Sequence, residues 1–511
     1  MDLPLPAVKP EFGDFTEAFD AGRTQVVWMK LVADLETPVS AMLKIAAGQP
    51  NSFLLESVEG GAIRGRYSFI GLRPDVIWRY ANGETAINRN ALTDAEALGP
   101  CPIGAADGVL ASLRALLAES RITLPDHLPP MAAGLFGYMA YDAVRLVEPK
   151  VPDTNPNTLE LPDSLFLRPT VMAIFDSLED TLTLVSPVWP DTEAVADTAY
   201  ETARTRLAAV VADLERDLPY RREQKSPGAS PLVPQSNMTR AQFHDVVRKC
   251  VDYIHAGDAF QIVPSQRFRV PFGLPPFAFY RALRRLNPSP FLYYMDFGGF
   301  HVVGSSPEIL VRVRDGRITL RPLAGTRKRG ATPAEDKALA EELLSDPKER
   351  AEHLMLLDLG RNDVGRVAKV GTVEVTDQFT IEYYSHVMHI ASNVEGELAD
   401  DKDAIDALLA GFPAGTVSGA PKVRAMEIID EVEPERRGVY AGCIGYFGAD
   451  GDMDTCIALR TAVIKDATLY VQAGGGVVAD SDPEFEYQET VNKAQALIRA
   501  AEEAEAFAGN G

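Results

Sequence analysis

Four runs rich in β-branched and aromatic residues follow one another in the second half of the chain, and they limit what it can fold into. They cover residues 260–270, 291–297, 300–313 and 317–325. Runs of this kind, bounded by Gly, Pro and Asp, are typical of β-strands. A capping-box helix at 239–257 precedes them, and helices and strands mix to the end of the chain. The pattern predicts an α+β or mixed α/β architecture.

The length of 511 residues exceeds that of one ordinary domain. A stretch rich in Pro, Ser and charge, 221–237, lacks apolar periodicity and is predicted to be a linker. We therefore expect an N-terminal region at 1–220 and a C-terminal catalytic domain at 238–505. In the N-terminal region the expected elements are helices at 104–119 and 190–217, strands at 165–176 and 181–189, and a Pro-rich loop at 148–164.

The charge balance narrows the classes of partner. Fifty basic and 73 acidic residues give a formal charge of −23, which repels nucleic acid and anionic membrane surfaces. The N-terminus lacks the features of a signal peptide, and no stretch reaches the roughly 18 apolar residues of a membrane span. We expect a cytoplasmic protein. The four cysteines, Cys101, Cys250, Cys443 and Cys456, are far apart, so reduced thiols are expected, with neither a zinc site nor disulfides.

An acidic pair stands at the start of an apolar helix. Asp346 and Pro347 form an N-cap followed by a proline at the first helical position. Glu349 is then the third helical residue, and its ordinary role would be to close a capping box on Asp346. Glu352 lies one turn further on the same face, ahead of a run that is nearly all leucine. A buried carboxylate there needs a cation or a hydrogen-bond donor.

The same arrangement returns near the C-terminus. Asp482 and Pro483 begin a helix that carries Glu486 and Glu489 on its early turns. Two helices with matched acidic pairs can converge on one divalent ion, and ligation by oxygen alone suits Mg²⁺. The alternative is a solvated helix end, in which Lys493 pairs with Glu489 four residues away.

Two glycine-rich segments are candidate anion sites. Gly474, Gly475 and Gly476 follow a strand, and their backbone N–H groups can approach an anion closely, although a bulge or turn would also use them. The spacing differs from the dinucleotide-binding fingerprint. The segment "GTVSGAPK" at 415–422 lacks the P-loop spacing, so neither segment predicts nucleotide binding.

Two histidines and one arginine are further candidates. His386 and His389 lie in a strand-like run, where residues three apart point to opposite faces, so at most one of them faces a site. Each could equally be structural. Arg460 lies in a strand-like run with apolar neighbours, and a buried arginine commonly has a carboxylate partner, from a substrate or from the protein.

Taken together, these segments closely resemble the chorismate-utilising enzymes, and most specifically their anthranilate synthase component I branch. The resemblance covers 236–500 almost completely and extends to the N-terminal half. The motifs that carry it are "FLLESVEGG", "GRYSFIG", "GDAFQIVPSQ", "GSSPE", "RPLAGTRKRG", "AEHLMLLDLGRND", "VMHIAS", "GTVSGAPKVRAMEIID", "RRGVYAGCIGYF", "DTCIALRTAV" and "AGGGVVADS" followed by "ET". The resemblance implies large, mainly antiparallel sheets in a sandwich flanked by helices, with the active site in a cleft.

The resemblance also implies a role for each site residue. Glu352 and Glu489 would hold Mg²⁺, with Glu349 and Glu486 beside them. Glu308 would be the general acid for loss of the hydroxyl at ring carbon 4, and His389 the base for the proton at carbon 2, with Thr416 as a further contact. The implied substrate-binding residues are Gln261, Gly325, Thr326, Tyr440, Arg460, Gly474, Gly475 and Gly476.

Two positions distinguish members of the family. Isochorismate and salicylate synthases have a water-activating lysine where this chain has Gln261, and aminodeoxychorismate synthase typically has a nucleophilic lysine where this chain has Ala324. The resemblance therefore implies that ammonia adds to chorismate and that pyruvate is lost to give anthranilate. The alternatives are aminodeoxychorismate synthase component I and a catalytically silent tryptophan-binding regulator.

No amidotransferase cysteine motif is present, so a separate glutamine amidotransferase subunit is expected, in a heterotetramer of two large and two small subunits.

A feedback site for L-tryptophan is implied by two further segments. "LLES" supplies Glu56 and Ser57, and "NPSPFLYY" supplies Pro290, Phe291 and Leu292. Many relatives have Tyr-Met where this chain has Phe291 and Leu292. For the apolar stretch the alternative is strand core, and for Ser57 a turn hydroxyl.

Overall fold

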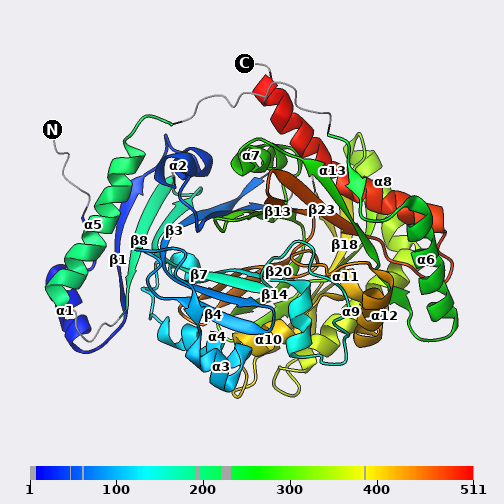
Figure 1. Ribbon diagram of the computed structural model, residues 1–511, viewed down its shortest axis with the longest axis horizontal. Coiled ribbons are helices and arrows are strands. Elements are labelled where there is room, and N and C mark those ends of the chain that lie inside the picture. Colours follow the sequence, from blue (N-terminus) through cyan, green and yellow to red (C-terminus); the bar gives the residue numbers. More distant parts are fainter. Residues whose placement is uncertain are drawn as a thin grey trace.

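The computed structural model describes residues 7–46, 48–59, 63–189, 195–219, 232–384 and 387–509. Within them two antiparallel sheets face each other, with helices on both outer surfaces (Figure 1). This confirms the predicted mixed α and β architecture and the antiparallel sandwich. The helices are α1 Phe12–Asp20, α2 Pro38–Ile45, α3 Pro102–Asp107, α4 Val109–Glu119, α5 Ala196–Leu214, α6 Arg240–His255, α7 Pro276–Leu286, α8 Pro333–Ser345, α9 Pro347–Gly365, α10 Ala404–Gly411, α11 Gly415–Ser418, α12 Lys422–Val432 and α13 Pro483–Gly509, with 3₁₀ turns at Pro130–Ala132 and Tyr141–Leu146.

The first sheet combines strands from both halves of the sequence. In order of pairing it contains β9 Gln235–Ser236, β11 Ser265–Pro271, β23 Thr468–Gly474, β22 Thr461–Lys465, β13 His301–Ser306, β12 Phe291–Asp296, β2 Ser52–Glu59, β3 Ile63–Ala81, β7 Ser164–Asp176, β8 Thr181–Val188 and β1 Gln25–Val32.

The second sheet also draws on both halves. It contains β5 Gly99–Pro100, β4 Glu84–Asn88, the far ends of β3 and β7, β6 Gly134–Met139, β20 Cys443–Gly448, β21 Met453–Ile457, β14 Ile309–Arg314, β15 Arg317–Leu320 and β18 Val387–Glu397, and the last of these also pairs with β16 Leu323–Lys328 and β17 Glu374–Tyr383. Two further strands, β10 Gln261–Ile262 and β19 Gly419–Ala420, pair with each other and form a separate two-stranded sheet.

Strands β3 and β7 join the two sheets by passing from one to the other. Their pairing changes register between Pro74 and Val76, where Pro74 lies opposite Pro169. Proline has no N–H to donate, so two facing prolines interrupt the ladder and allow both strands to bend. Because the sheets share these strands, the N-terminal and C-terminal halves form one sandwich; the boundaries 1–220 and 238–505 stay a prediction.

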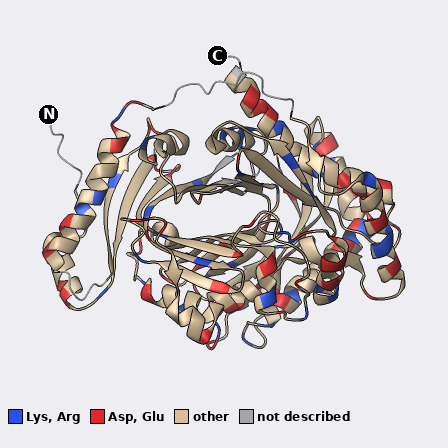
Figure 2. Ribbon diagram, viewed as in Figure 1, with Lys and Arg blue, Asp and Glu red and all other residues tan. Residues whose placement is uncertain are grey.

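Three apolar layers hold the sandwich together. One lies between the sheets and includes Phe53, Phe136, Tyr293 and Ile444. A second packs α1, α2, α5, α7 and α13 onto the outer face of the first sheet, and a third packs α4, α9 and α10 onto the second. Both faces of each sheet are thus buried, which explains why the strands read as continuous apolar runs. Charged residues lie mainly on the covering helices and loops (Figure 2).

The predicted strands exist, but three of the four runs are split at prolines. The run 260–270 is broken at Pro264, the run 300–313 at Pro307, and the run 317–325 at Pro322. Proline removes a ladder donor and disfavours a central strand position. Each of these three runs therefore forms two strands, and the breaks lie close to predicted site residues.

The remaining predicted elements differ mainly at their ends. The helix expected at 104–119 is two helices separated by Gly108, whose φ is +90°. The helix expected at 190–217 is α5, and the capping-box helix is α6, with Thr239 and Gln242 bonded reciprocally. Most of the predicted linker lies outside the described residues, but β9 at its end pairs with β11.

Two expectations about chemistry can be compared directly with the structure. All four cysteines are free and buried. None of the helices in the described ranges is long and apolar enough to cross a membrane.

Candidate active site

Glu308 is a buried carboxylic acid at the break between β13 and β14. Thr416 Oγ1 donates to its Oε1 over 2.9 Å, and the backbone N–H of Leu323 donates to the same oxygen over 3.3 Å. Burial raises the pKa of Glu308 to about 8, although Thr416, Leu323 and Arg460 act in the opposite direction. The group is therefore protonated at neutral pH and can donate a proton.

His389 lies on β18 as a neutral imidazole. Its Nδ1 lies 3.0 Å from the carbonyl oxygen of Gly325 and 3.1 Å from Thr326 Oγ1, so Nδ1–H points to the carbonyl and the other nitrogen is the free base. That other nitrogen, Nε2, is buried and has no hydrogen-bond partner among the described residues. Burial lowers the pKa of His389 to about 4. His386, the other histidine considered, lies outside the described residues.

Arg460 was predicted to lie on a strand, and this is wrong. It lies in the connection between β21 and β22, with a left-handed φ of +47°. Burial lowers the pKa of Arg460, and nearby Tyr384 and Glu308 raise it. Within the described ranges, no carboxylate forms an ion pair with its guanidinium. A mostly buried cation of this kind fits an anionic ligand.

The first acidic pair lies at the start of α9, as predicted. Asp346 caps the helix by accepting from the N–H groups of Lys348 and Glu349. Only half of the expected capping box forms, because the Glu349 carboxylate accepts from Arg327 over 3.1 Å instead. Glu352 accepts from Gln261 Nε2 over 3.1 Å. Burial raises the pKa of Glu352, and the charges of Glu349 and Glu489 raise it further.

The second pair lies at the start of α13, which Asp482 caps. Glu486 is buried; its Oε1 accepts from Ser481, while its Oε2 has no hydrogen-bond partner in the part of the chain that the structure describes. Burial, followed by the charge of Glu489, raises the pKa of Glu486 to about 7. Lys493 pairs with Glu489 over 2.6 Å and also donates to the Gly474 carbonyl, so the predicted intrahelical pair exists.

The glycines lie between the two acidic pairs and allow close approach. A Cβ atom on Gly475 would lie 3.0 Å from Glu486 Oε2, and one on Gly476 would lie 2.6 Å from Gln261 Nε2. A Cβ on Gly474 would lie 2.9 Å from the Tyr440 hydroxyl. Gly325 has a φ of +69°, and a Cβ there would lie 3.0 Å from Glu349 Oε2. The glycines therefore bring the backbone next to both acidic pairs.

These contacts bring the two distant helix starts together. Gln261 contacts Glu352 and adjoins Gly476, while the adjacent Gly475 adjoins Glu486. The donor set suits Mg²⁺, because it consists of carboxylate oxygens and includes a buried oxygen without a partner. No group of three or more His, Cys, Asp or Glu side chains within the described ranges is arranged to hold a metal by itself. A magnesium ion here would need ligands from water or substrate, as that ion usually has.

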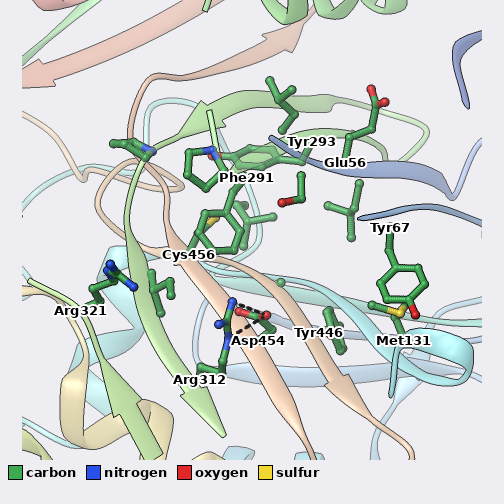
Figure 3. A pocket seen from close by; sticks show the side chains of 18 of the residues that line it. Glu56, Tyr67, Met131, Phe291, Tyr293, Arg312, Arg321, Tyr446, Asp454 and Cys456 are labelled. Atoms are coloured by element: carbon green, nitrogen blue, oxygen red, sulfur yellow. Dashed lines mark hydrogen bonds and ion pairs between the residues drawn. The ribbon is translucent and has the colours of Figure 1, made fainter. Parts of the chain in front are cut away.

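A cavity of about 630 Å³ lies between the two sheets. Of the residues predicted for feedback, Ser57, Pro290, Phe291 and Leu292 line it, and Figure 3 shows Phe291 and Tyr293 on one side, with Arg312, Asp454 and Tyr446 on the other. The fifth, Glu56, is also at the cavity wall, but its carboxylate points away from Tyr67 and Asp454. It accepts from Arg284 and from Tyr280 on α7, each over 2.5 Å. The pairing of β2 with β3 shifts register between Glu56 and Val58, so Ser57 lies at an irregularity of the ladder. The Glu56 carboxylate bonds to α7, whereas Ser57 lines the cavity.

The sequence reasoning missed the residues that join this cavity to Glu308. Tyr384 donates to Glu382, which also pairs with Arg321, and the rings of Tyr384 and His389 are 5.3 Å apart. Tyr384, Glu382 and Arg321 all line the cavity. The aromatic run "IEYY" and the arginine before "PLAGT" were visible in the sequence, but no spacing signal connects them.

Comparisons with known proteins concern the family of the chain. The model of the chorismate binding enzyme family matches residues 66–499. The protein named anthranilate synthase component 1 from Cereibacter sphaeroides is 58% identical over 503 residues, covering 98% of this chain and 99% of that protein. The protein of the same name from Pseudomonas putida is 47% identical, with 92% and 93% covered.

Solved structures show the same fold. A crystal structure of anthranilate synthase component I from Streptococcus pneumoniae superimposes with a TM-score of 0.73 at 37% identity, covering 85% of this chain and 92% of that one. The menaquinone-specific isochorismate synthase from Escherichia coli superimposes with a TM-score of 0.69 at 20% identity, covering 94% and 95%, and at that identity the likeness concerns the fold alone.

Proposed function

The chain belongs to the family of chorismate binding enzymes, and from this premise we propose that it converts chorismate and ammonia into anthranilate and pyruvate, the first step of tryptophan biosynthesis. The observation that carries the proposal is that a protonated Glu308 and a neutral His389 both bond to the backbone of β16, at Leu323 and Gly325. The reaction needs an acid and a base at neutral pH: the raised pKa keeps Glu308 protonated, and the lowered pKa keeps His389 unprotonated and open to a proton.

The substrate carboxylates require cations and donors. We assign the carboxylate of the enolpyruvyl side chain to Arg460 and Tyr440, because a planar guanidinium meets a carboxylate with two parallel hydrogen bonds. The backbone at Gly474 and Gly476 and the hydroxyl of Thr326 are the assigned neutral donors, whereas the Gly475 N–H already donates to the Pro264 carbonyl over 3.2 Å. Gln261 donates to Glu352 and orients that carboxylate, which is assigned to magnesium.

Two proton transfers follow from the assigned positions. Glu308 gives its proton to the hydroxyl at ring carbon 4, which leaves as water while ammonia adds at carbon 2. Thr416 and the Leu323 N–H then stabilise the carboxylate that remains. The ammonium group formed at carbon 2 releases one proton. His389 Nε2 next takes the proton from carbon 2 while the bond between ring carbon 3 and the side-chain oxygen breaks; enolpyruvate leaves and gains a proton to become pyruvate, and the ring becomes aromatic.

The acidic pairs are assigned to magnesium. Glu352 and Glu489 would hold the ion, with Glu349 and Glu486 beside them, and its chemistry when bound is to withdraw charge through the ring carboxylate. The chain's own contribution is the arrangement of carboxylates: Gln261 orients Glu352, Lys493 orients Glu489, and Ser481 holds one oxygen of Glu486.

The ammonia source and the regulator are further parts of the proposal. A separate glutamine amidotransferase subunit would supply ammonia, in a heterotetramer with two copies of each chain. L-Tryptophan would inhibit by occupying the cavity that Ser57, Pro290, Phe291 and Leu292 line. Both features are proposed by analogy with the relatives' family, and the cytoplasm stays the predicted compartment.

The decisive experiment supplies the purified chain with chorismate, Mg²⁺ and an ammonium salt and measures anthranilate fluorescence and product mass. Anthranilate and pyruvate in equal amounts support the proposal. A product that keeps an amine at ring carbon 4 would identify aminodeoxychorismate synthase component I instead. Absence of chorismate turnover, together with tryptophan binding, would identify a silent regulator. Glutamine should replace ammonium only when the amidotransferase subunit is added.

A further inference from the structure

Arg437 and Glu433 form a buried ion pair behind the candidate active site. Both are almost completely excluded from solvent, with exposed fractions of 2% and 4%. Arg437 Nε donates to Glu433 Oε2 over 3.0 Å, and its Nη2 donates to Oε1 over 2.6 Å. Glu433 Oε1 also accepts from the N–H and the hydroxyl of Ser265, each over 2.8 Å. The pair is therefore a fully bonded, rigid unit.

The same guanidinium connects three segments that carry site residues. Its Nη1 donates to the carbonyl oxygen of Val417 over 2.6 Å, and its Nη2 donates to that of Val263 over 2.6 Å. Val417 adjoins Thr416, and Val263 lies two residues after Gln261. The guanidinium also lies over the ring of Tyr440, 5.6 Å from its centre. One side chain thus contacts the segment of Thr416, which bonds to the acid, the segment of Gln261, which bonds to a metal-assigned glutamate, and the ring of Tyr440, which is assigned to the substrate.

Stability alone does not account for such a pair. Burying two charges costs free energy that their attraction only partly returns, and apolar replacements of similar shape are often no less stable. The planar fork of arginine, however, fixes several acceptors at set angles, which lysine cannot do. The arrangement fits a side chain that fixes the positions of the backbone carbonyls at Val417 and Val263.

We propose that Arg437 is a positioning residue for the reaction, which holds the backbone at Val417 so that Thr416 stays bonded to Glu308. This inference rests on the proposed chorismate reaction. A lysine at position 437 keeps the charge but cannot reach Glu433 and both carbonyls together. Thr416 then moves away from Glu308, the carboxylate loses a donor, and the pKa of Glu308 rises because the Thr416 hydrogen bond lowers it.

The test compares Arg437→Lys with Arg168→Lys. Arg168 is also buried, with an exposed fraction of 7%, and makes two hydrogen bonds with Asp75, over 2.9 and 2.8 Å, but its partners include no assigned site residue. For Arg437→Lys we expect kcat to fall about 10- to 100-fold and the alkaline limb of its pH profile to move to higher pH. Arg168→Lys should keep the wild-type profile.

A double-mutant cycle with Thr416→Val identifies the route of the effect. The fold-loss of kcat caused by Arg437→Lys should be smaller by roughly threefold or more in the Thr416→Val background than in the wild type. The reason is that the hydrogen bond protected by Arg437 is already absent there. Equal factors in both backgrounds, or an unmoved alkaline limb, would overturn the inference. If Arg437→Lys does not fold, Arg437→Gln with Glu433→Gln leaves no unpaired buried charge and gives the same readout. A wild type without chorismate turnover refutes the proposed function, whereas an active wild type with an unaltered limb in the variant refutes only this inference.

Discussion

Thr416 Oγ1 and Glu308 Oε1 lie 2.9 Å apart in a hydrogen bond between residues 108 positions apart in the sequence. The bond holds one oxygen of a carboxylic acid whose burial keeps it protonated near neutral pH. A proton donor is most effective when its pKa lies near the working pH.

Replacing Glu308 with glutamine should remove the acid while keeping its shape. We expect kcat to fall by about 10²- to 10⁴-fold, the usual contribution of a general acid. In the wild type, kcat should decline as pH rises above about 8, because Glu308 then loses its proton. Steady-state anthranilate fluorescence from pH 6 to 10 measures both. An alkaline limb that survives in Glu308→Gln would assign it to another group.

Thr416→Val should weaken rather than abolish catalysis. Loss of one hydrogen bond to a carboxylate that develops charge is worth about 1.5 to 3 kcal/mol, or about 10- to 100-fold in kcat. Because this bond lowers the pKa of Glu308, the alkaline limb should move to higher pH. The pH dependence of kcat is the measurement. A limb that moves to lower pH would contradict the assigned bond.

His389→Gln should block the second proton transfer but leave the first. We expect anthranilate formation to fall by about 10²- to 10⁴-fold, while the aminated intermediate that still carries the enolpyruvyl side chain accumulates. Mass spectrometry of quenched reactions detects it. Thr326→Val, which removes the neighbouring hydroxyl and keeps the imidazole, is the control and should release no intermediate. Equal loss of both steps in His389→Gln would place the imidazole elsewhere in the mechanism.

Removal of divalent ions should stop the reaction, and Glu352→Gln should raise the Mg²⁺ concentration needed for half-maximal activity by about 10-fold or more. The reason is that Glu352 lies next to Gln261 and is influenced by the charges of Glu349 and Glu489. Chelator titration followed by Mg²⁺ addition measures the requirement. Asp480→Asn, at an exposed pair with Lys348, is the control and should respond as the wild type does.

Ser57 and Glu56 should differ sharply although they are neighbours. Ser57→Ala changes the cavity wall, and we expect weaker inhibition by tryptophan with kcat unchanged. Glu56→Ala removes the partner of Arg284 and Tyr280, leaves a buried cation, and should cost about 3 to 5 kcal/mol of stability. Inhibition curves and thermal melts separate the two effects. Similar behaviour of both variants in both assays would contradict the different partners assigned to the two side chains.

Much of the site was accessible from the sequence because its signals are local. The Asp-Pro caps at Asp346 and Asp482 fix where two helices begin, and hence which turn carries each glutamate. The capping box at Thr239 and the proline positions are likewise local. The orientation of Glu56 was less accessible, since it depends on the register of β2 with its neighbours. Arg460 was misplaced because its left-handed φ is imposed by the connection between two strands.

By itself, the sequence determined the element types, the helix starts, the four glutamates and, through its resemblance to a family, the residues that deserved attention. The tertiary structure alone decided that β3 and β7 pass between two sheets, that Glu349 bonds to Arg327 instead of closing its capping box, and that Arg437 ties three segments together. The reason is physical: caps and periodicities are set by neighbours within a few residues, whereas pKa values, orphaned lone pairs and buried ion pairs depend on groups that only folding brings into contact.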